Sequence, residues 1–193
     1  MPNAEPQFGA YLDAARSGSG PAFGWLYTTF SPRVFGYFRA QGAAEPDELT
    51  NDVFASAFRS LSKFNGDAAA FRSWLFTIAR NRLVDERRRL GRRAVTVPGD
   101  AAEHCEYQPG GDVEAEALEN LASEWVRSVL AQLAPDQRDV LVLRLVADLT
   151  IDQIAAIVSK RPGAVKALQR RGLAALRKIV TEPDVSPTRR GDV

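Results

Sequence analysis

The chain has 193 residues, of which 45% are hydrophobic, so it is long enough for one ordinary domain or two small domains with packed cores. Its formal net charge of +1 argues against uniform binding of a polyanion, but the charge is segregated along the chain, which allows a local basic patch. A single cysteine and a single histidine exclude an internal disulfide, a histidine-based triad and a histidine-rich metal site.

The first residues, 1–21, are predicted to form a flexible N-terminal segment. Residues 8–15 are compatible with a short helical turn, which the Ser-Gly-Ser-Gly-Pro sequence at residues 17–21 ends. From residue 22, apolar and aromatic residues recur at helical spacing up to Phe38, which predicts a core helix, and Pro32 is expected to kink or divide it. A second helix is predicted to begin near Pro46, because proline suits a first helical turn and the neighbouring acidic residues favour a helix N-terminus.

This second predicted helix has two distinct faces. Its inner stripe is formed by Leu49, Val53, Phe54, Ala57, Phe58 and Leu61. The side chains that lie largely outside the stripe are polar or acidic: Asp47, Glu48, Asn51, Asp52 and Ser56. The outer face is either a solvated acidic surface, which is the usual case, or a docking surface for a basic partner.

The segment from Lys63 to Arg93 dominates the functional interpretation. It opens with an Asn65-Gly66-Asp67 turn, and the helix that follows has one apolar face, formed by Phe71, Trp74, Leu75, Ile78, Ala79 and Leu83. Arginines fill the rest of the helix: Arg72, Arg80, Arg82, Arg87, Arg88, Arg89, Arg92 and Arg93. Either this is a solvated basic helix with ordinary core aromatics, or the arginines contact phosphates while the loop and the aromatics hold unstacked bases.

The next segment, residues 94–117, is predicted to be a flexible acidic linker, since it contains prolines, glycines and acidic residues but no lysine or arginine. His104 and Cys105 lie within it and are assigned no role. Helical periodicity resumes over residues 118–181, and residues 182–193 are predicted to be a disordered tail. The chain is therefore expected to contain two helical units on either side of a linker.

The last two predicted helices form a helix-turn-helix. Thr150 and Gln153 match a capping box for a short helix, which is followed by a tight turn at residues 159–161 and by Pro162 in the first turn of the last helix. The outer face of that helix is basic, with small residues that allow close approach to a major groove: Arg161, Ala164, Lys166, Ala167, Gln169, Arg170 and Arg171. An α-hairpin with a solvated basic face is the alternative.

One unit thus has features suited to unpaired bases and the other has features suited to duplex DNA. Stacking on aromatic side chains is worth roughly 1–3 kcal/mol per base, while exposing a base from its pair costs a few kcal/mol. A few such contacts can hold a short melted segment but cannot open a long one unaided. This layout implies a larger partner machine.

These segments resemble the extracytoplasmic-function (ECF, group IV) sigma factors of bacterial RNA polymerase, over about residues 23–180. FGWLYTTFSPRVFGYF is similar to the opening helix of sigma region two, and PDELTNDVFASAFRSL to the segment that docks on the polymerase clamp helices. KFNGDAAAFRSWLFTIARNRLVDERRR is similar to the segment that melts and reads the minus-ten element. Residues 133–178 resemble region four, whose last helix reads the minus-thirty-five element. The resemblance implies an all-α fold of two small helical domains, residues 22–93 and 118–181, joined by the linker.

The resemblance also implies roles for individual residues. The polymerase clamp would be faced by Asp47, Glu48, Asn51, Asp52 and Phe54. A flipped minus-ten base would be held by Lys63, Phe64, Asn65, Gly66 and Asp67. Strand separation and backbone contact would be supported by Arg72, Trp74, Asn81 and Arg88. The upstream element would be read by Arg161, Ala164, Lys166, Ala167, Arg170 and Arg171.

The chain departs from the family pattern in its last unit. Ser159 and Lys160 stand at turn positions where the family often has glycine and an apolar residue, and Gly172 is expected to interrupt the last helix. These departures bear on the bend of the motif and on its preference for an upstream sequence.

The resemblance predicts a promoter-specificity subunit that binds core polymerase, promoter DNA and an anti-sigma factor, with no catalysis and no cofactor. The leading alternative is a stand-alone helix-turn-helix regulator with an N-terminal sensor or dimerisation domain. An enzyme is the third alternative, in which Glu48 and Asp52 hold a metal, but no further ligand spacing supports it. The absence of a signal sequence and of a long apolar run predicts a soluble, cytoplasmic protein without membrane insertion.

Overall fold

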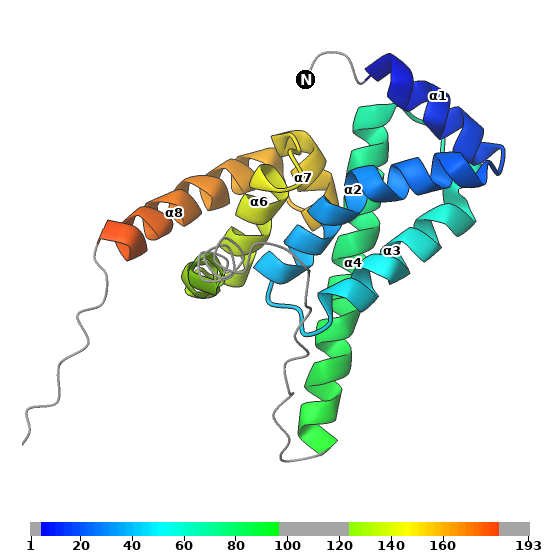
Figure 1. Ribbon diagram of the computed structural model, residues 1–193. Coiled ribbons are helices and arrows are strands. Elements are labelled where there is room, and N and C mark those ends of the chain that lie inside the picture. Colours follow the sequence, from blue (N-terminus) through cyan, green and yellow to red (C-terminus); the bar gives the residue numbers. More distant parts are fainter. Residues whose placement is uncertain (1–4, 97–123, 182–193) are drawn as a thin grey trace, which may run out of the picture.

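The computed structural model describes residues 5–96 and 124–181, and the regular structure in these two ranges is helical throughout (Figure 1). The predicted all-α fold is confirmed. In chain order, the elements are α1 (Glu5–Arg16), α2 (Gly20–Ala40), α3 (Pro46–Ser60), the 3-10 helix η1 (Leu61–Lys63), α4 (Ala68–Thr96), a helix over residues 124–131, α6 (Pro135–Leu145), α7 (Ile151–Val158) and α8 (Pro162–Thr181).

Helix α1 corrects the prediction that residues 1–21 form a flexible segment. Its Phe8, Leu12 and Ala15 share one face, and all three side chains are buried. The ring centroid of Phe8 lies 5.6 Å from that of Phe71 in α4 and 5.9 Å from that of Phe30 in α2. The apolar stripe of α1 is only about two turns long, and a helix this short is stabilised mainly by tertiary packing. Such packing cannot be read from a short apolar pattern in the sequence.

Helix α2 is continuous through Pro32, so of the kink or division expected there, the division does not occur. Proline removes one backbone hydrogen bond from a helix interior, but Phe30 and Val34 on either side of it are buried in the core and hold the helix together. The helix begins with Ser19, whose side chain accepts a hydrogen bond from the backbone N–H of Ala22 at 3.4 Å. Local propensity is therefore overridden by packing.

Helices α3 and α4 pack against each other and complete the first unit. Four residues of the predicted apolar face of α4 are buried, namely Phe71, Leu75, Ala79 and Leu83. Phe76, which the periodicity does not assign to that face, is fully buried as well. The C-terminal part of α4 extends beyond the other helices of this unit (Figure 1). Helix α4 ends at Thr96, so it includes the first residues of the predicted linker, and linker residues 97–117 and the predicted tail lie outside the described residues.

The predicted helix-turn-helix corresponds to α7 and α8. The capping box is formed: Thr150 Oγ1 accepts from the Gln153 backbone N–H at 3.3 Å, and Gln153 Oε1 accepts from the Thr150 N–H at 2.8 Å. Ser159 ends α7 with a φ of 54°, in the left-handed region that usually selects glycine. Gly172 does not interrupt α8 but is buried against α6, where an added Cβ would lie 2.8 Å from Leu141 Cδ1.

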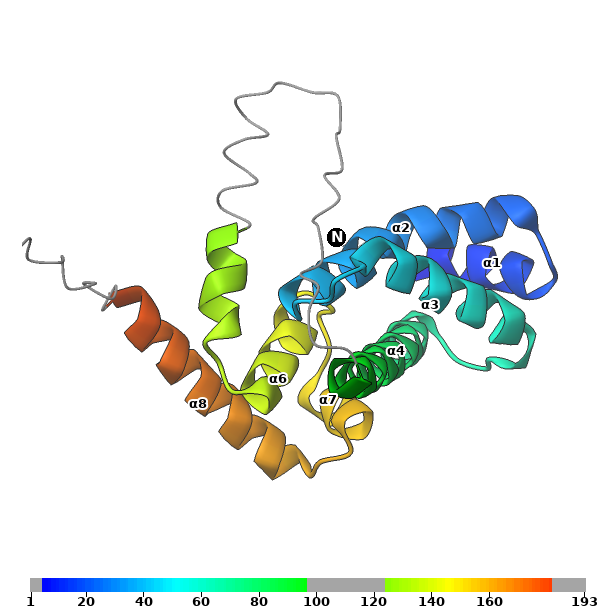
Figure 2. The same ribbon diagram turned by 90° about the horizontal axis from the view of Figure 1, so that it is seen from below.

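The two helical units lie against each other in the described structure (Figure 2). Helix α7 packs on α4, α6 approaches α2, and buried side chains of both units join one hydrophobic cluster. Helix α8 extends away from the first unit in both views (Figures 1 and 2). This arrangement leaves the outer face of α8 uncovered.

Candidate nucleic-acid interface

The loop between η1 and α4 contains the residues predicted to hold an unpaired base. Its exposed residues are Lys63, Asn65 and Asp67, and its half-buried residues are Phe64 and Gly66. Asp67 also has a structural role, because its Oδ1 accepts a hydrogen bond of 2.8 Å from the backbone N–H of Ala70 and so caps the start of α4. The Asn65 side chain has no hydrogen-bond partner among the described residues, so its amide is available to a ligand.

The aromatic side chains at this loop pack on one another. The ring centroids of Phe64 and Trp74 are 4.8 Å apart in a stacked arrangement, and Phe64 meets Phe71 edge-on at 5.8 Å. The guanidinium of Arg16, from α1, lies over the Phe64 ring with its Cζ 5.4 Å from the ring centroid. In this conformation Phe64 and Trp74 support the loop from within, and the exposed polar side chains are the groups that face solvent.

Several arginines of α4 cross-link helices. Three of them donate hydrogen bonds to residues of other helices or their caps: Arg80 to Asp139, Arg82 to Ser56 and Arg87 to Gln41. Hydrogen bonds to charged groups contribute about 1.5–3 kcal/mol each when they are shielded from water. These three arginines of α4 therefore stabilise the fold. This role differs from the two that the sequence suggested, which were a solvated basic face and contacts with phosphates.

The predicted DNA contacts farther along α4 differ in their accessibility. Arg72 is half-buried and pairs with Asp148 of the second unit at 3.2 Å. Arg88 is exposed and lies 3.7 Å from Asp85 on the same helix, and Asn81 is also exposed. Asn81 and Arg88 are thus open to solvent, whereas Arg72 takes part in the contact between the units.

Asp139 is the polar centre of that contact. Its Oδ1 accepts hydrogen bonds from Tyr37 Oη at 3.1 Å and from Gln41 Nε2 at 3.3 Å, and its Oδ2 accepts one from Arg80 Nε at 2.8 Å. Burial raises the pKa of the Tyr37 phenol well above its ordinary value, and the adjacent Asp139 carboxylate raises it further. The phenol therefore stays protonated and acts as a donor to the carboxylate.

The outer face of α8 is basic and accessible. Ala167 and Gln169 are half-buried, and the other predicted contact residues of this face are exposed: Arg161, Ala164, Lys166, Arg170 and Arg171. The opposite face holds α8 on its unit through the buried Val165, Leu168 and Gly172. Guanidinium and ammonium groups on one exposed helix face can contact phosphates and base edges in a major groove.

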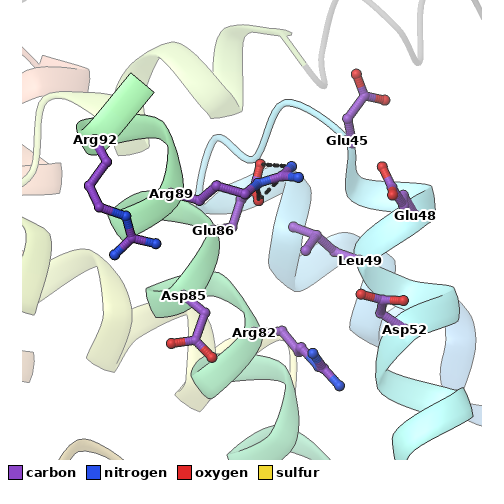
Figure 3. A pocket seen from close by; sticks show the side chains of 9 residues that line it. All are labelled: Glu45, Glu48, Leu49, Asp52, Arg82, Asp85, Glu86, Arg89 and Arg92. Carbon is purple, nitrogen blue, oxygen red and sulfur yellow. Dashed lines mark hydrogen bonds and ion pairs between the residues drawn. The ribbon is translucent and has the colours of Figure 1, made fainter. Parts of the chain in front are cut away.

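Acidic residues of α3 line a groove against the C-terminal part of α4 (Figure 3). The groove residues from α3 and its cap are Glu45, Glu48, Leu49 and Asp52, and those from α4 are Arg82, Asp85, Glu86, Arg89 and Arg92. The predicted partner-facing residues Asp47, Glu48, Asn51 and Asp52 are exposed. Phe54 is only 2% exposed, with its ring 4.8 Å from that of Tyr27, so the prediction that it faces a partner is wrong. It belongs to the apolar stripe that anchors α3.

The two units match known families in the order that the sequence predicts. Residues 26–93 match Sigma-70 region 2, and residues 123–176 match Sigma-70, region 4. The ECF RNA polymerase sigma factor SigC of Mycobacterium tuberculosis (strain CDC 1551 / Oshkosh) is 31% identical over 152 residues, which are 79% of this chain and 77% of the relative. This chain belongs to the ECF family of RNA polymerase sigma factors.

Other relatives and solved structures agree with this assignment. The ECF sigma factor BldN of Streptomyces coelicolor is 29% identical over 173 residues, which are 89% of this chain but only 65% of BldN. The structure of CnrH with the cytosolic domain of CnrY has a TM-score of 0.67 at 23% identity and covers 91% of this chain and 97% of CnrH. The sigma factor RpoE of Bartonella quintana, in complex with the anti-sigma factor NepR, has a TM-score of 0.64 at 20% identity over 83% of this chain and 98% of that one. Both structures share the fold.

In this ECF sigma factor, the region 2 match contains the loop and the described side chains of α4, and the region 4 match contains α7 and α8 up to residue 176. Sequence reasoning missed Arg16, Tyr37, Gln41 and Asp139 as contact residues. Tyr37 and Asp139 are 102 residues apart, and Arg16 and Gly66 are 50 apart, so no local pattern links them. None of the helices in the described residues combines the length and apolar character that crossing a membrane requires.

Proposed function

We propose that this ECF sigma factor directs core RNA polymerase to specific promoters by reading a minus-thirty-five duplex with region 4 and capturing melted minus-ten DNA with region 2. The observation that carries the proposal is the placement of an exposed polar loop and an exposed basic helix on two different helical units. Unpaired and duplex DNA expose different groups, so separate surfaces suit them. A stand-alone regulator is not favoured, since it has no need of a region 2.

The minus-ten element binds at the start of α4 in this proposal. The exposed Asn65 amide can form hydrogen bonds with the edge of an unpaired base, and the Lys63 ammonium can contact a phosphate. Asn81 and Arg88 extend this surface along α4 to the backbone of the separated strand. Trp74 contributes through its packing against Phe64.

The minus-thirty-five element binds α8. A B-form major groove is about 12 Å wide and admits a helix. The exposed Lys166 and Arg170 contact base edges or phosphates, and the small side chain of Ala164 allows close approach. Arg161 and Arg171 flank these residues and supply further phosphate contacts.

Core polymerase binds the exposed polar face of α3, which carries Asp47, Glu48, Asn51 and Asp52. Acidic side chains suit a basic partner surface, and Phe54 supports this face from the core. We propose an anti-sigma factor as a further partner, because the structurally similar RpoE is bound to one. The proposal places the protein in the cytoplasm as a factor without enzymatic activity, with units at residues 22–93 and 118–181 and a linker at residues 94–117.

The deciding experiment is run-off transcription with core polymerase on a promoter library. Sequenced transcripts are expected to start at defined sites that share two upstream elements, and to vanish when either core polymerase or this protein is omitted. In parallel, the free protein should bind promoter duplex weakly. Tight operator binding without polymerase, combined with no defined start site, would support the regulator instead. Within the described residues, no three His, Cys, Asp or Glu side chains form a group that could hold a metal ion.

A further inference from the structure

Arg16, the last residue of α1, contacts the loop between η1 and α4 in two ways. Its Nη2 donates a hydrogen bond of 2.9 Å to the backbone carbonyl oxygen of Gly66. Its guanidinium also lies over the Phe64 ring, with Cζ 5.4 Å from the ring centroid. Its Nη1 also pairs with Asp13, one turn earlier on α1, at 2.8 Å, but the Asp13 side chain is 73% exposed, so this pair contributes little to the position of the guanidinium.

Helix α1 presents Arg16 from a fixed platform. Phe8 and Leu12 are 5% and 2% exposed, so α1 is anchored in the core of the first unit. The Arg16 side chain itself is 24% exposed, so solvent competes only partly for its contacts. Because one face of α1 is fixed in the core, the helix holds Arg16 in place, and Arg16 in turn holds the loop residues that it contacts.

The first residue that Arg16 contacts, Phe64, has little freedom. Its ring is stacked on Trp74 at a centroid distance of 4.8 Å, and its backbone N–H donates a hydrogen bond of 3.0 Å to the carbonyl oxygen of Leu61. Arg16 adds a cation–π contact to this arrangement. The start of the loop is thus held by ring packing and by the guanidinium together.

The second residue, Gly66, lies in a tight space. An added Cβ would lie 2.8 Å from Phe64 Cζ and 2.8 Å from Ala70 Cβ, so this close approach requires glycine. Asn65 stands between Phe64 and Gly66 and is exposed. The Asn65 amide, which can both donate hydrogen bonds to a base and accept them, is therefore flanked by two residues that Arg16 contacts.

We propose that Arg16 is a positioning residue for base recognition, which fixes the backbone of residues 64–66 so that Asn65 meets the unpaired minus-ten base in one orientation. This inference rests on the proposed function, in which the loop captures that base. Arg16 acts through Phe64 and Gly66 and does not touch DNA. A fixed loop discriminates between bases, whereas a loose loop adjusts to several. Arg16 precedes the region 2 match, which begins at residue 26.

The test measures the base selectivity of holoenzymes that contain full-length variants of this protein. The template is a promoter defined by run-off transcription, premelted across the minus-ten element, with each base placed in turn at every position of the melted segment. The readout is the ratio of transcript from the preferred base to transcript from the others. Arg16→Ala is expected to lower this ratio roughly three- to tenfold, as for the loss of one ordering hydrogen bond, with core binding changed less than about twofold.

Three further variants separate positioning from general damage. Asp13→Asn, the matched control, removes the ion pair but leaves the bond to Gly66, and should keep the wild-type ratio within about twofold. Arg16→Lys keeps the charge but loses the planar guanidinium, and should give an intermediate ratio. Gly66→Ala leaves Arg16 intact but forces the loop to shift, and should lower the ratio as Arg16→Ala does. In the free protein, hydrogen exchange of residues 63–67 should be faster in Arg16→Ala than in wild type.

The outcomes distinguish the two proposals. Wild-type selectivity in Arg16→Ala, together with reduced selectivity in Asn65→Ala, overturns the role of Arg16 and leaves the proposed function standing. Wild-type selectivity in both variants overturns the base-capturing loop, and the role of Arg16 falls with it. If Arg16→Ala does not fold, unchanged ratios in Arg16→Lys and Gly66→Ala overturn the inference.

Discussion

Tyr37 joins the two helical units through a neutral hydrogen-bond donor. Its side chain is fully buried, and its hydroxyl donates to the Asp139 carboxylate across a sequence separation of 102 residues. Burial and the nearby carboxylate both disfavour the phenolate, which raises the phenol pKa above its ordinary value of 10.0. The folded state therefore holds this proton more tightly than the unfolded chain does.

We predict that Tyr37→Phe flattens the pH dependence of stability in alkaline solution. Above about pH 10 the unfolded chain ionises at Tyr37 while the folded protein does not, so the free energy of unfolding falls as the pH rises. One proton corresponds to about 1.4 kcal/mol per pH unit, and Tyr37→Phe removes this contribution. Urea unfolding between pH 9 and 11 measures the slope. Tyr27→Phe removes a phenol from the surface, and an equal effect of both substitutions would contradict the prediction.

At the scale of elements, the packing of α8 on α6 depends on one missing side chain. Gly172 sits in the middle of α8, where helix propensity alone favours alanine by about 1 kcal/mol. The position is buried, and an added Cβ would lie 2.8 Å from Cδ1 and 3.2 Å from Cγ of Leu141. Close approach of two helices therefore outweighs the local preference.

We predict that Gly172→Ala lowers the free energy of unfolding by up to about 2 kcal/mol, because overpacking typically costs 1–3 kcal/mol and the gain in helix propensity offsets only about 1 kcal/mol of it. Gly24→Ala in α2 is the matched control, since an added Cβ there meets nothing within 4 Å. That variant should be neutral or more stable than wild type. Thermal unfolding followed by circular dichroism measures both, and a stabilised Gly172→Ala would disprove the close packing.

The outer face of α8 makes a separate prediction. Lys166→Ala and Arg170→Ala should each weaken binding of the holoenzyme to promoter duplex, by about 1–3 kcal/mol for a base contact. A phosphate contact would instead weaken binding to all sequences alike and lower the salt dependence by about one counterion. Arg33→Ala removes the same charge from an exposed position on α2 and serves as the control. Unchanged transcription in both α8 variants would contradict the groove assignment.

At the scale of the whole molecule, the contact between the units bears on access to DNA. Arg72, a proposed minus-ten contact, is paired with Asp148 of the second unit, and Arg80 is paired with Asp139. The proposed contact of Arg72 with promoter DNA therefore requires the units to separate at this point. The two units are held against each other by a shared apolar cluster and by a small number of specific polar contacts.

We predict that the Arg80–Asp139 pair has a coupling energy of about 1–3 kcal/mol in a double-mutant cycle, because both side chains are largely shielded and the bond is charge-assisted. The exposed Arg88–Asp85 pair, with both side chains 69% exposed, should give less than about 0.5 kcal/mol. Asp139→Ala should also increase the radius of gyration in X-ray scattering. A coupling no larger than that of the exposed pair would show that apolar packing alone holds the units together.

The sequence predicted much of the fold because most of its signals are local. The capping box at Thr150, the proline at the start of α8 and the apolar stripe of α4 each act within a few residues of their own helix. The exposed polar faces of α3 and α8 followed from the same periodicity. Predictions failed where distant packing outweighs local signals, as for the helical segment α1 and for the division expected in α2 at Pro32. Periodicity placed Phe54 on the inner stripe of α3 correctly, and its burial contradicts only the partner-facing role that the resemblance implied.

By itself, the sequence determined the helical class, the order of the two units and the residues that face outward on each helix, since helical periodicity is written in the spacing of neighbouring side chains. Only the tertiary structure decided which residues accept hydrogen bonds from the arginines of α4 and why position 172 is glycine. It also decided that Arg16 contacts the residues on either side of Asn65. Those answers depend on atoms of residues far apart in the chain, such as Arg16 and Gly66 or Arg80 and Asp139. Such contacts form only when packing brings their helices together, and no spacing along the chain encodes them.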